Sequence, residues 1–211
     1  MAAATPLHSI PNPERRTALD DGGGSGPVRA ANTDPTLGVL IFVASEAMLF
    51  GGWISALLIA RAAAPFWPPP NQPRLPAART GFNTVLLVAS FFTIRRVLQS
   101  LRAHNRAAAV RWMMITSTLG AAFLALQGSE WVKLIRFGLT MTSSLYGGLF
   151  YLIVGAHGLH LVVALALLGF MTVRVGRGRY DSDLRGMFAF SLYWSFVVIL
   201  WPILYALVYL A

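Results

Sequence analysis

The sequence has 211 residues, of which 56% are hydrophobic and only 12% are charged, and its formal net charge is +9. Soluble domains usually carry about 25% charged residues, so this composition indicates lipid as the main solvent of the chain. The absence of cysteine excludes a disulfide framework, a thiolate metal site and a cysteine nucleophile. The basic residues lie between apolar runs and match no nucleic-acid-binding motif, so we interpret them as topology signals and lipid contacts, with no nucleic-acid partner.

Residues 1–35 are predicted to form a disordered cytoplasmic tail. The segment is rich in proline and glycine and has almost no continuous apolar stretch. It therefore cannot bury enough surface to offset the entropy lost on ordering. It also lacks the basic start and apolar core of a secretory signal. Residues 36–211 are predicted to form one transmembrane domain.

Five apolar segments of that domain are candidates to cross a bilayer, for which a helix needs about 20 residues. The second has the shortest apolar part, and it crosses only if the helix continues through Arg95 and Arg96 with their side chains reaching the interface. The last contains Pro202, which a membrane helix tolerates. The predicted fold class is therefore all-α, a polytopic membrane protein with a five-transmembrane-helix bundle. The expected spans are residues 37–60, 81–101, 112–132, 145–173 and 187–210.

The distribution of arginine and lysine predicts the orientation of these spans. The N-terminal tail and the loops after the second and fourth spans hold 12 of these residues, and the other side holds 5. Basic loops are retained in the cytoplasm. We therefore predict a cytoplasmic N-terminus and a C-terminus outside.

Besides Arg95 and Arg96, whose side chains are expected to reach the interface, four acidic or histidine side chains fall inside the predicted spans: Glu46, Glu130, His157 and His160. A charge in hydrocarbon costs several kcal/mol, so each of them needs a partner or neutralisation. Glu46 lies roughly 14 Å into its helix, near mid-membrane. It is open to two interpretations, a carboxylate that handles protons or contacts a partner, and a structural residue that stays protonated or hydrogen-bonded. Glu130 lies near the outer end of its span, with Gln127 on the same face, where interfacial solvation is easy.

His157 and His160 are three residues apart on one helix face, which raises the question of a metal site. Two histidines on one turn cannot bind opposite faces of a haem, and a zinc or copper ion would need a third or fourth ligand. The remaining histidines, His8 and His104, lie in the tail and a cytoplasmic loop. We therefore predict no haem or metal in this chain and interpret the pair as hydrogen-bonding contacts between helices.

Three arginines near the expected outer interface, Arg61, Arg74 and Arg79, are candidates for lipid headgroup contacts, and ordinary solvated loop residues are the alternative. The sequence shows no nucleophile–base set, phosphate loop or metal box, so no catalytic residue is predicted. These observations fit a transporter, a quinone-binding anchor or an accessory subunit of a membrane complex.

Six motifs narrow this choice. They are LIFVASEAMLFGG (40–52), FWPPP (66–70), FNTVLLVAS (82–90), LQGSEW (126–131), YGGLFYLIVGAHGLH (146–160) and LYWSFVVILW (192–201). As an ordered set, with the spacing of the helices between them, they resemble subunit III of cytochrome c oxidase and its bacterial quinol-oxidase relatives. The resemblance covers residues 36–210 and fits the short five-helix bacterial form.

The resemblance implies a non-catalytic subunit of a proton-pumping haem-copper terminal oxidase, which reduces oxygen to water in a bacterial cytoplasmic (inner) membrane. The family subunit holds no redox centre, packs against the catalytic subunit I with its haems and copper, carries phospholipid between its helices and supports proton uptake. Cytochrome c is the expected electron donor, with quinol as the alternative. Glu46 and Glu130 match the family's two membrane carboxylates, and His157 and His160 match its HGLH pair.

One departure from the family pattern concerns the last span. The family usually has histidine after the tryptophan and aspartate three positions later, whereas this chain has Ser195 and Val198. This leaves open an accessory subunit of a nitric oxide reductase. Two further candidates are an independent proton-coupled transporter that uses Glu46 and a quinone-anchoring subunit with quinone near His157.

Overall fold

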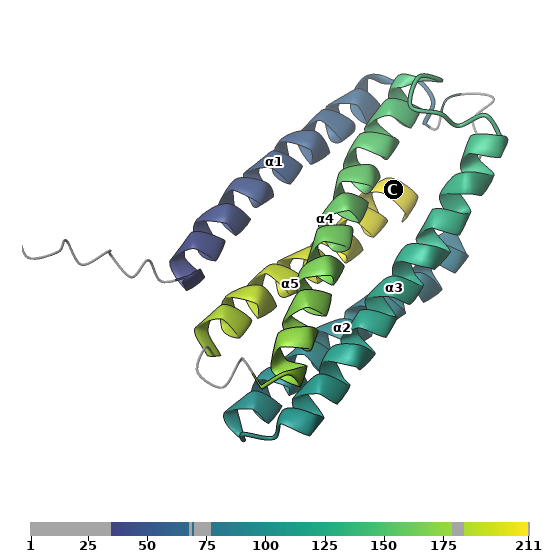
Figure 1. The fold of residues 1–211 in the computed structure, drawn as a ribbon. Helices are drawn as coiled ribbons and strands as arrows, with labels where there is room; N and C mark the ends of the chain where they lie inside the picture. The colour runs from purple at the N-terminus through teal and green to yellow at the C-terminus, as the bar shows by residue number, and fades with distance from the viewer. Residues whose placement is uncertain (1–34, 68, 70–76, 179–183, 211) are drawn as a thin grey trace, which may run out of the picture. The chain divides into compact units, whose positions relative to one another are not determined.

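A computed structural model of the chain describes residues 35–67, 69, 77–178 and 184–210. These residues form five long helices, and no strand occurs among them (Figure 1). The tail predicted for residues 1–35 lies outside this description except for Pro35, which begins the first helix. The helices are α1 (Pro35–Ala63), α2 (Ala77–Arg102), α3 (Arg106–Arg136), α4 (Leu145–Gly176) and α5 (Leu184–Tyr205), which continues into the π-helical turn η2 (Ala206–Leu210).

All five helices are long and apolar enough to cross a membrane, which confirms the all-α class with five spanning helices. Each helix, with the last counted together with η2, is longer than the span predicted for it, because helical hydrogen bonding continues beyond the apolar residues into turns that carry arginine. The second helix does continue through Arg95 and Arg96. The Arg95 guanidinium lies over the ring of Phe91, 4.3 Å from its centroid.

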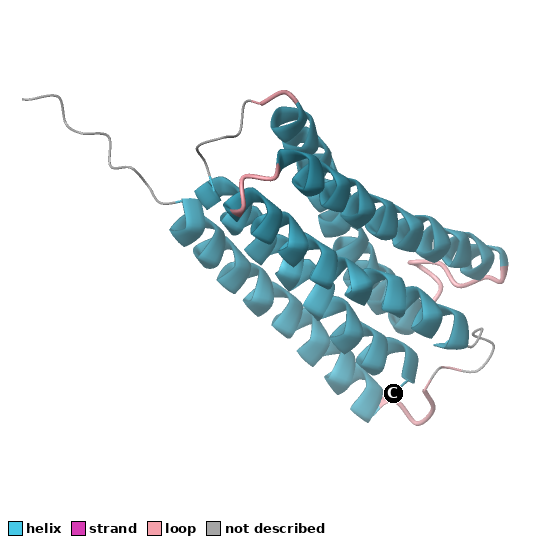
Figure 2. Ribbon diagram, turned by 90° about the horizontal axis from the view of Figure 1, so that it is seen from below, coloured by secondary structure: helices cyan, strands magenta, loops and turns pink. Residues whose placement is uncertain are grey.

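The helices differ greatly in how much of their surface the bundle covers. In the most apolar stretch of each helix, 61% of the residues of α5 with η2 are buried, against 6% of those of α1. The last helix packs against α2, α1 and α4, and α3 packs against α2 and α4. Figure 1 labels these helices, and Figure 2 shows the bundle from below. The core of the protein is therefore built around α5, while most of α1 faces outward.

Hydrogen bonds from tryptophan side chains fix α5 against α2. The indole N–H of Trp201 donates to the Thr84 hydroxyl at 2.9 Å, and that of Trp194 donates to Ser90 at 3.2 Å. A Cβ atom at Gly120 of α3 would lie 3.0 Å from the Trp194 ring, so this glycine leaves room for the indole. Small and hydroxyl side chains thus let large aromatic groups approach neighbouring helices, as is usual in membrane bundles.

The helix ends are fixed by local capping. The side chain of Asn105 accepts a hydrogen bond from the Ala108 amide at 2.9 Å and begins α3, and Ser144 begins α4 in the same way. The guanidinium of Arg106 donates to the carbonyl of Gly176, so a cation from the start of α3 satisfies a carbonyl at the C-terminus of α4.

Two tyrosines near the C-terminus tie the last turns back to the bundle. The hydroxyl of Tyr205 donates to the carbonyl of Ala77 in the first turn of α2 at 3.0 Å. The hydroxyl of Tyr209 accepts a hydrogen bond from the Gln127 amide of α3 at 2.8 Å. The ends of α2, α3 and α5 are therefore joined at one end of the bundle.

Candidate functional site

Glu46 of α1 and His160 of α4 form a hydrogen-bonded pair. The distance from His160 Nε2 to Glu46 Oε2 is 2.9 Å, and only 15% of the Glu46 side chain and 18% of the His160 side chain are exposed. Phe50 lies edge-on against the imidazole, with the ring centroids 5.5 Å apart. The carboxylate near the middle of α1 thus has its partner on another helix, as a polar group in hydrocarbon requires.

The second ring nitrogen of His160 limits how protons are arranged in this pair. Nδ1 lies 2.7 Å from the carbonyl oxygen of Ala156. A carbonyl can only accept, so Nδ1 carries a hydrogen. The bond between Nε2 and Glu46 then requires one more proton, which resides either on the carboxyl or on the imidazole. In both arrangements the net charge of the pair is zero, so the pair fits a membrane interior and can move a proton from one atom to the other.

His157 has a different environment, although it is one turn away on the same helix. The residue is 1% exposed, and neither of its ring nitrogens has a hydrogen-bond partner in the described part of the chain. Its ring lies over Trp201 at a centroid distance of 4.9 Å and edge-on to Phe123 at 6.4 Å. The two histidine side chains of α4 therefore contact different helices. His157 contacts α3 and α5, and His160 contacts α1.

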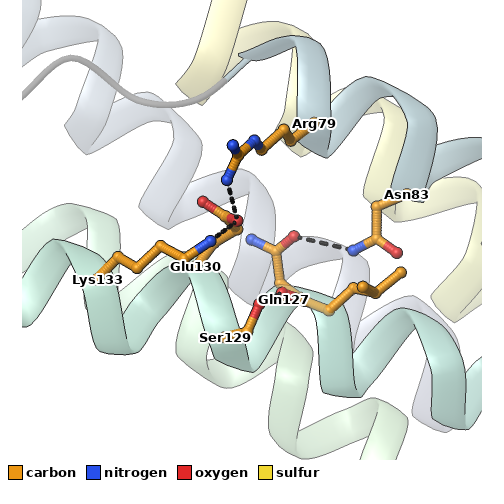
Figure 3. Close-up of polar contacts among 7 residues, drawn as sticks. Arg79, Asn83, Gln127, Ser129, Glu130 and Lys133 are labelled. Carbon is orange, nitrogen blue, oxygen red and sulfur yellow. Dashed lines mark hydrogen bonds and ion pairs between the residues drawn. The ribbon is translucent and has the colours of Figure 1, made fainter.

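Glu130 of α3 is the acceptor in a three-residue ion cluster (Figure 3). Its Oε1 lies 2.7 Å from Lys133 Nζ and 3.5 Å from Arg79 Nη1. The side chain of Glu130 is 13% exposed, whereas those of Lys133 and Arg79 are 46% and 71% exposed. Two cations thus compensate this carboxylate at the end of α3.

A neutral hydrogen-bonded chain lies one turn deeper in the bundle (Figure 3). The Asn83 amide nitrogen donates to the Phe123 carbonyl at 3.2 Å and to Gln127 Oε1 at 3.3 Å, and Gln127 donates to Tyr209. Asn83 and Gln127 are each 3% exposed. Gln127 and Glu130 lie three residues apart on α3 but have different partners: Gln127 contacts Asn83 and Tyr209, and Glu130 contacts the two cations.

The structure describes two of the three arginines that were predicted to contact lipid headgroups. Arg61 lies in the last turn of α1, Arg79 joins the Glu130 cluster, and Arg74 lies outside the described residues. Sequence reasoning did not include Lys133, Asn83 or Tyr209. The i, i+3 spacing of Glu130 and Lys133 was a signal that could have identified the lysine. The contacts of Asn83 and Tyr209 join distant segments and had no such local signal.

Ser195 and Val198 of α5 stand where the family pattern has histidine and aspartate. Neither position forms a polar pair with the other. The Ser195 hydroxyl donates to the Ser191 carbonyl of its own helix at 2.7 Å, and Val198 is 2% exposed in the apolar core. Both positions are thus satisfied by a bond within α5 and by apolar packing.

The described part of the chain offers no cluster of side chains suited to a metal ion. No group of three or more histidine, cysteine, aspartate or glutamate side chains there could hold a metal ion.

Five spanning helices, with ionisable groups paired between them, define an integral, multi-pass membrane protein.

Comparison with known proteins identifies the family. The family model described as cytochrome c oxidase subunit III matches residues 27–211. Cytochrome c oxidase subunit 3 of Synechocystis sp. is 34% identical over 217 residues, which cover 99% of this chain and 92% of the relative. Probable cytochrome c oxidase subunit 3 of Nocardia farcinica is 34% identical, over 82% of this chain and 86% of its own. Cytochrome c oxidase subunit 3 of Coturnix japonica is 31% identical, over 82% of this chain and 67% of its own.

The chain therefore belongs to the cytochrome c oxidase subunit III family, and the resemblance stated from its motifs is confirmed.

Proposed function

We propose that this chain is the non-catalytic subunit III of a proton-pumping haem-copper oxidase that reduces oxygen to water. The observation that carries the proposal is the match to the family over residues 27–211, which includes all five helices. The haems and copper reside in the catalytic subunit I, against which this chain packs with the other oxidase subunits. This chain holds no redox centre of its own.

The finer features of the proposal rest on the family resemblance and on the charge distribution. Cytochrome c is the expected electron donor, with quinol as the alternative, and the complex resides in a bacterial cytoplasmic membrane. The excess of arginine and lysine on one side, 12 against 5, supports a cytoplasmic N-terminus and a C-terminus outside. Phospholipids bind at its surface, with Arg61 and Arg79 as headgroup contacts.

Within the complex, the Glu46–His160 pair supports proton uptake by the catalytic subunit. The proposal is supported by the single proton that the pair must share and by the partial exposure of both side chains. A pair that keeps zero net charge while its proton changes position can exchange that proton without placing an unpaired charge in hydrocarbon.

The variant Glu46→Ala in the assembled complex tests this role. We expect assembly to be largely retained, with slower proton uptake or a shorter active lifetime during turnover, because His160 loses its partner. The measurements are oxygen consumption, proton uptake and the rate of inactivation in purified complex. Ser45→Ala is the matched control, since the Ser45 hydroxyl bonds only to carbonyls of its own helix in the described structure. Unchanged uptake and unchanged inactivation in the Glu46 variant would refute the role.

Affinity purification of the tagged chain in mild detergent tests the proposed function itself. The eluate is analysed by mass spectrometry and by a reduced-minus-oxidised spectrum. Haem-bearing subunits together with oxygen-reducing activity are expected. A nitric-oxide-reducing partner would instead identify an accessory subunit of that enzyme. A colourless chain alone, under conditions that preserve other respiratory complexes, would contradict the oxidase proposal and favour a transporter.

A further inference from the structure

Tyr193 of α5 contacts both helices that carry the Glu46–His160 pair. Its hydroxyl donates to the backbone carbonyl of His160 in α4 at 3.2 Å. Its ring lies 5.8 Å from the ring of Phe42 in α1, measured between the centroids. Phe42 precedes Glu46 by four residues, which is about one turn of the helix. One side chain of a third helix therefore holds the pair's histidine at its backbone and reaches α1 one turn from the glutamate.

The half of α1 that precedes Glu46 is packed loosely against the bundle. The two residues of α1 that are fully buried, Phe50 and Leu57, both lie after Glu46. Before Glu46, a pocket of about 430 Å³ lies between α1, α4 and α5. Side chains that border a pocket lose the dispersion contacts that a close-packed neighbour supplies. Little packing therefore fixes the distance between α1 and α4 on this side of the pair.

Tyr193 and Phe42 form the end of this pocket that is nearest to the pair. Among the lining residues of α1, Phe42 is the nearest to Glu46 in sequence. Among those of α4, Val163 is the nearest to His160. Tyr193 borders the pocket with them and is 6% exposed. The contact between Tyr193 and Phe42 therefore lies between the pocket and the Glu46–His160 pair.

The hydrogen bond of the pair is sensitive to any displacement of α1. The distance from His160 Nε2 to Glu46 Oε2 is 2.9 Å, and such a bond is largely lost once the two atoms are more than about 3.5 Å apart. After Glu46, the contact of Phe50 with the imidazole holds α1 in place. Before Glu46, the contact between Tyr193 and Phe42 has the corresponding position.

We propose that Tyr193 is a positioning residue of the Glu46–His160 pair. Its ring holds α1 through Phe42, and its hydroxyl holds α4 at the His160 carbonyl. Together these contacts keep the carboxyl group and the imidazole within hydrogen-bonding distance. The inference deepens the proposed role of the pair in proton uptake and rests on it.

Infrared spectroscopy of the purified full-length chain with isotope-labelled glutamate tests the positioning. The chain has three glutamates, and the bands of Glu46 are identified by their loss in Glu46→Gln. The spectrum of His160→Leu shows where these bands lie when the bond to the imidazole is absent. We expect Tyr193→Phe to lower the ratio of bonded to unbonded Glu46 about fivefold, which is the scale of one neutral hydrogen bond. Unchanged bands would overturn the proposal.

Tyr205→Phe is the matched control. Tyr205 also lies on α5, and its hydroxyl also donates to a backbone carbonyl of another helix, that of Ala77 at 3.0 Å. It lies about 18 Å farther along the helix than Tyr193, so its loss is expected to change the ratio less than about twofold. An equal change in the control would show a general loosening of α5 and would also overturn the proposal.

A second substitution keeps the test decisive if loss of the Tyr193 hydroxyl disturbs folding. Phe42→Leu leaves the other three side chains in place and removes only the ring contact. Circular dichroism verifies that the helical content is retained. We expect the bands of Glu46 to shift toward those of the His160→Leu spectrum. A folded Phe42 variant with unchanged bands would refute the positioning of α1.

Proton uptake by the assembled complex is measured on the same variants. We expect uptake to slow in proportion to the loss of the bonded form of Glu46. Shifted bands with unchanged uptake would contradict the proposed role of the pair in proton uptake while supporting the positioning by Tyr193. Unchanged bands would refute the positioning alone, whatever the rate of uptake.

Discussion

The two membrane carboxylates of this chain are compensated in different ways. Glu46 lies near the middle of α1 and has one partner, the imidazole of His160, which is itself ionisable. Glu130 lies near the end of α3 and has two cations, Lys133 and Arg79, that are partly exposed. The pair near mid-helix can be neutral in every part, whereas the cluster at the helix end has permanently charged partners that are themselves exposed.

We infer that the position of a carboxylate along a spanning helix, and thus its depth in the membrane, determines which partner it can have. A lysine or arginine in mid-membrane would add the cost of burying a second permanent charge. A histidine avoids that cost, because the shared proton can neutralise both groups. Three substitutions separate the effect of depth from the effect of charge, and the largest effect is expected for the deepest site.

Replacing His160 by leucine should have the largest effect of the three. Glu46 would lose its partner inside the bundle, and we expect the free energy of unfolding to fall by about 3 kcal/mol. Thermal unfolding in detergent micelles measures this change in the free energy of unfolding. The double variant Glu46→Leu/His160→Leu should recover most of the loss, since no polar group is left unpaired. If the double variant were as unstable as the single one, packing and not pairing would hold α1 to α4.

Replacing Gln127 by leucine tests how much a buried but uncharged polar contact contributes to stability. The side chain is buried and neutral, and its loss leaves the Tyr209 hydroxyl and one N–H of Asn83 without the partner they now have. We expect a loss of about 2 kcal/mol that does not depend on salt concentration, because no ion pair is broken. Unfolding measured at low and high salt provides the check, and a strong dependence on salt would contradict this interpretation.

Replacing Lys133 by glutamine should have the smallest effect. Both cations of the cluster are partly exposed, so we expect a loss of about 0.5 kcal/mol at low salt that disappears at about 1 M salt. The same unfolding assay gives the value, with Arg136→Gln as the control at a nearby exposed position. A loss as large as that of the His160 variant would show that depth does not set the energetic difference between the two sites.

Much of the fold could be predicted from the sequence because lipid imposes a simple rule. A segment in hydrocarbon must satisfy its own backbone hydrogen bonds, so long apolar runs such as that of α4 form helices whatever surrounds them. The helix ends were predicted less well. Asn105 and Arg106 extend helical structure through polar residues that a hydropathy criterion assigns to loops.

The site was less predictable, since its partners are distant in sequence. Glu46, His157 and His160 were singled out because ionisable residues are rare in a span, but nothing local indicates that His160 faces α1 while His157 faces Trp201. That choice depends on how α4 is rotated about its axis in the bundle. Asn83 was overlooked because a neutral amide has no charge to mark it.

The tyrosines that close the bundle make the polar contacts of α2 and α3 depend on the last helix. Gln127 of α3 donates to Tyr209, and the carbonyl of Ala77 in α2 accepts from Tyr205. A variant shortened before residue 205 would leave both groups without these partners, although every residue of α2 and α3 would still be present.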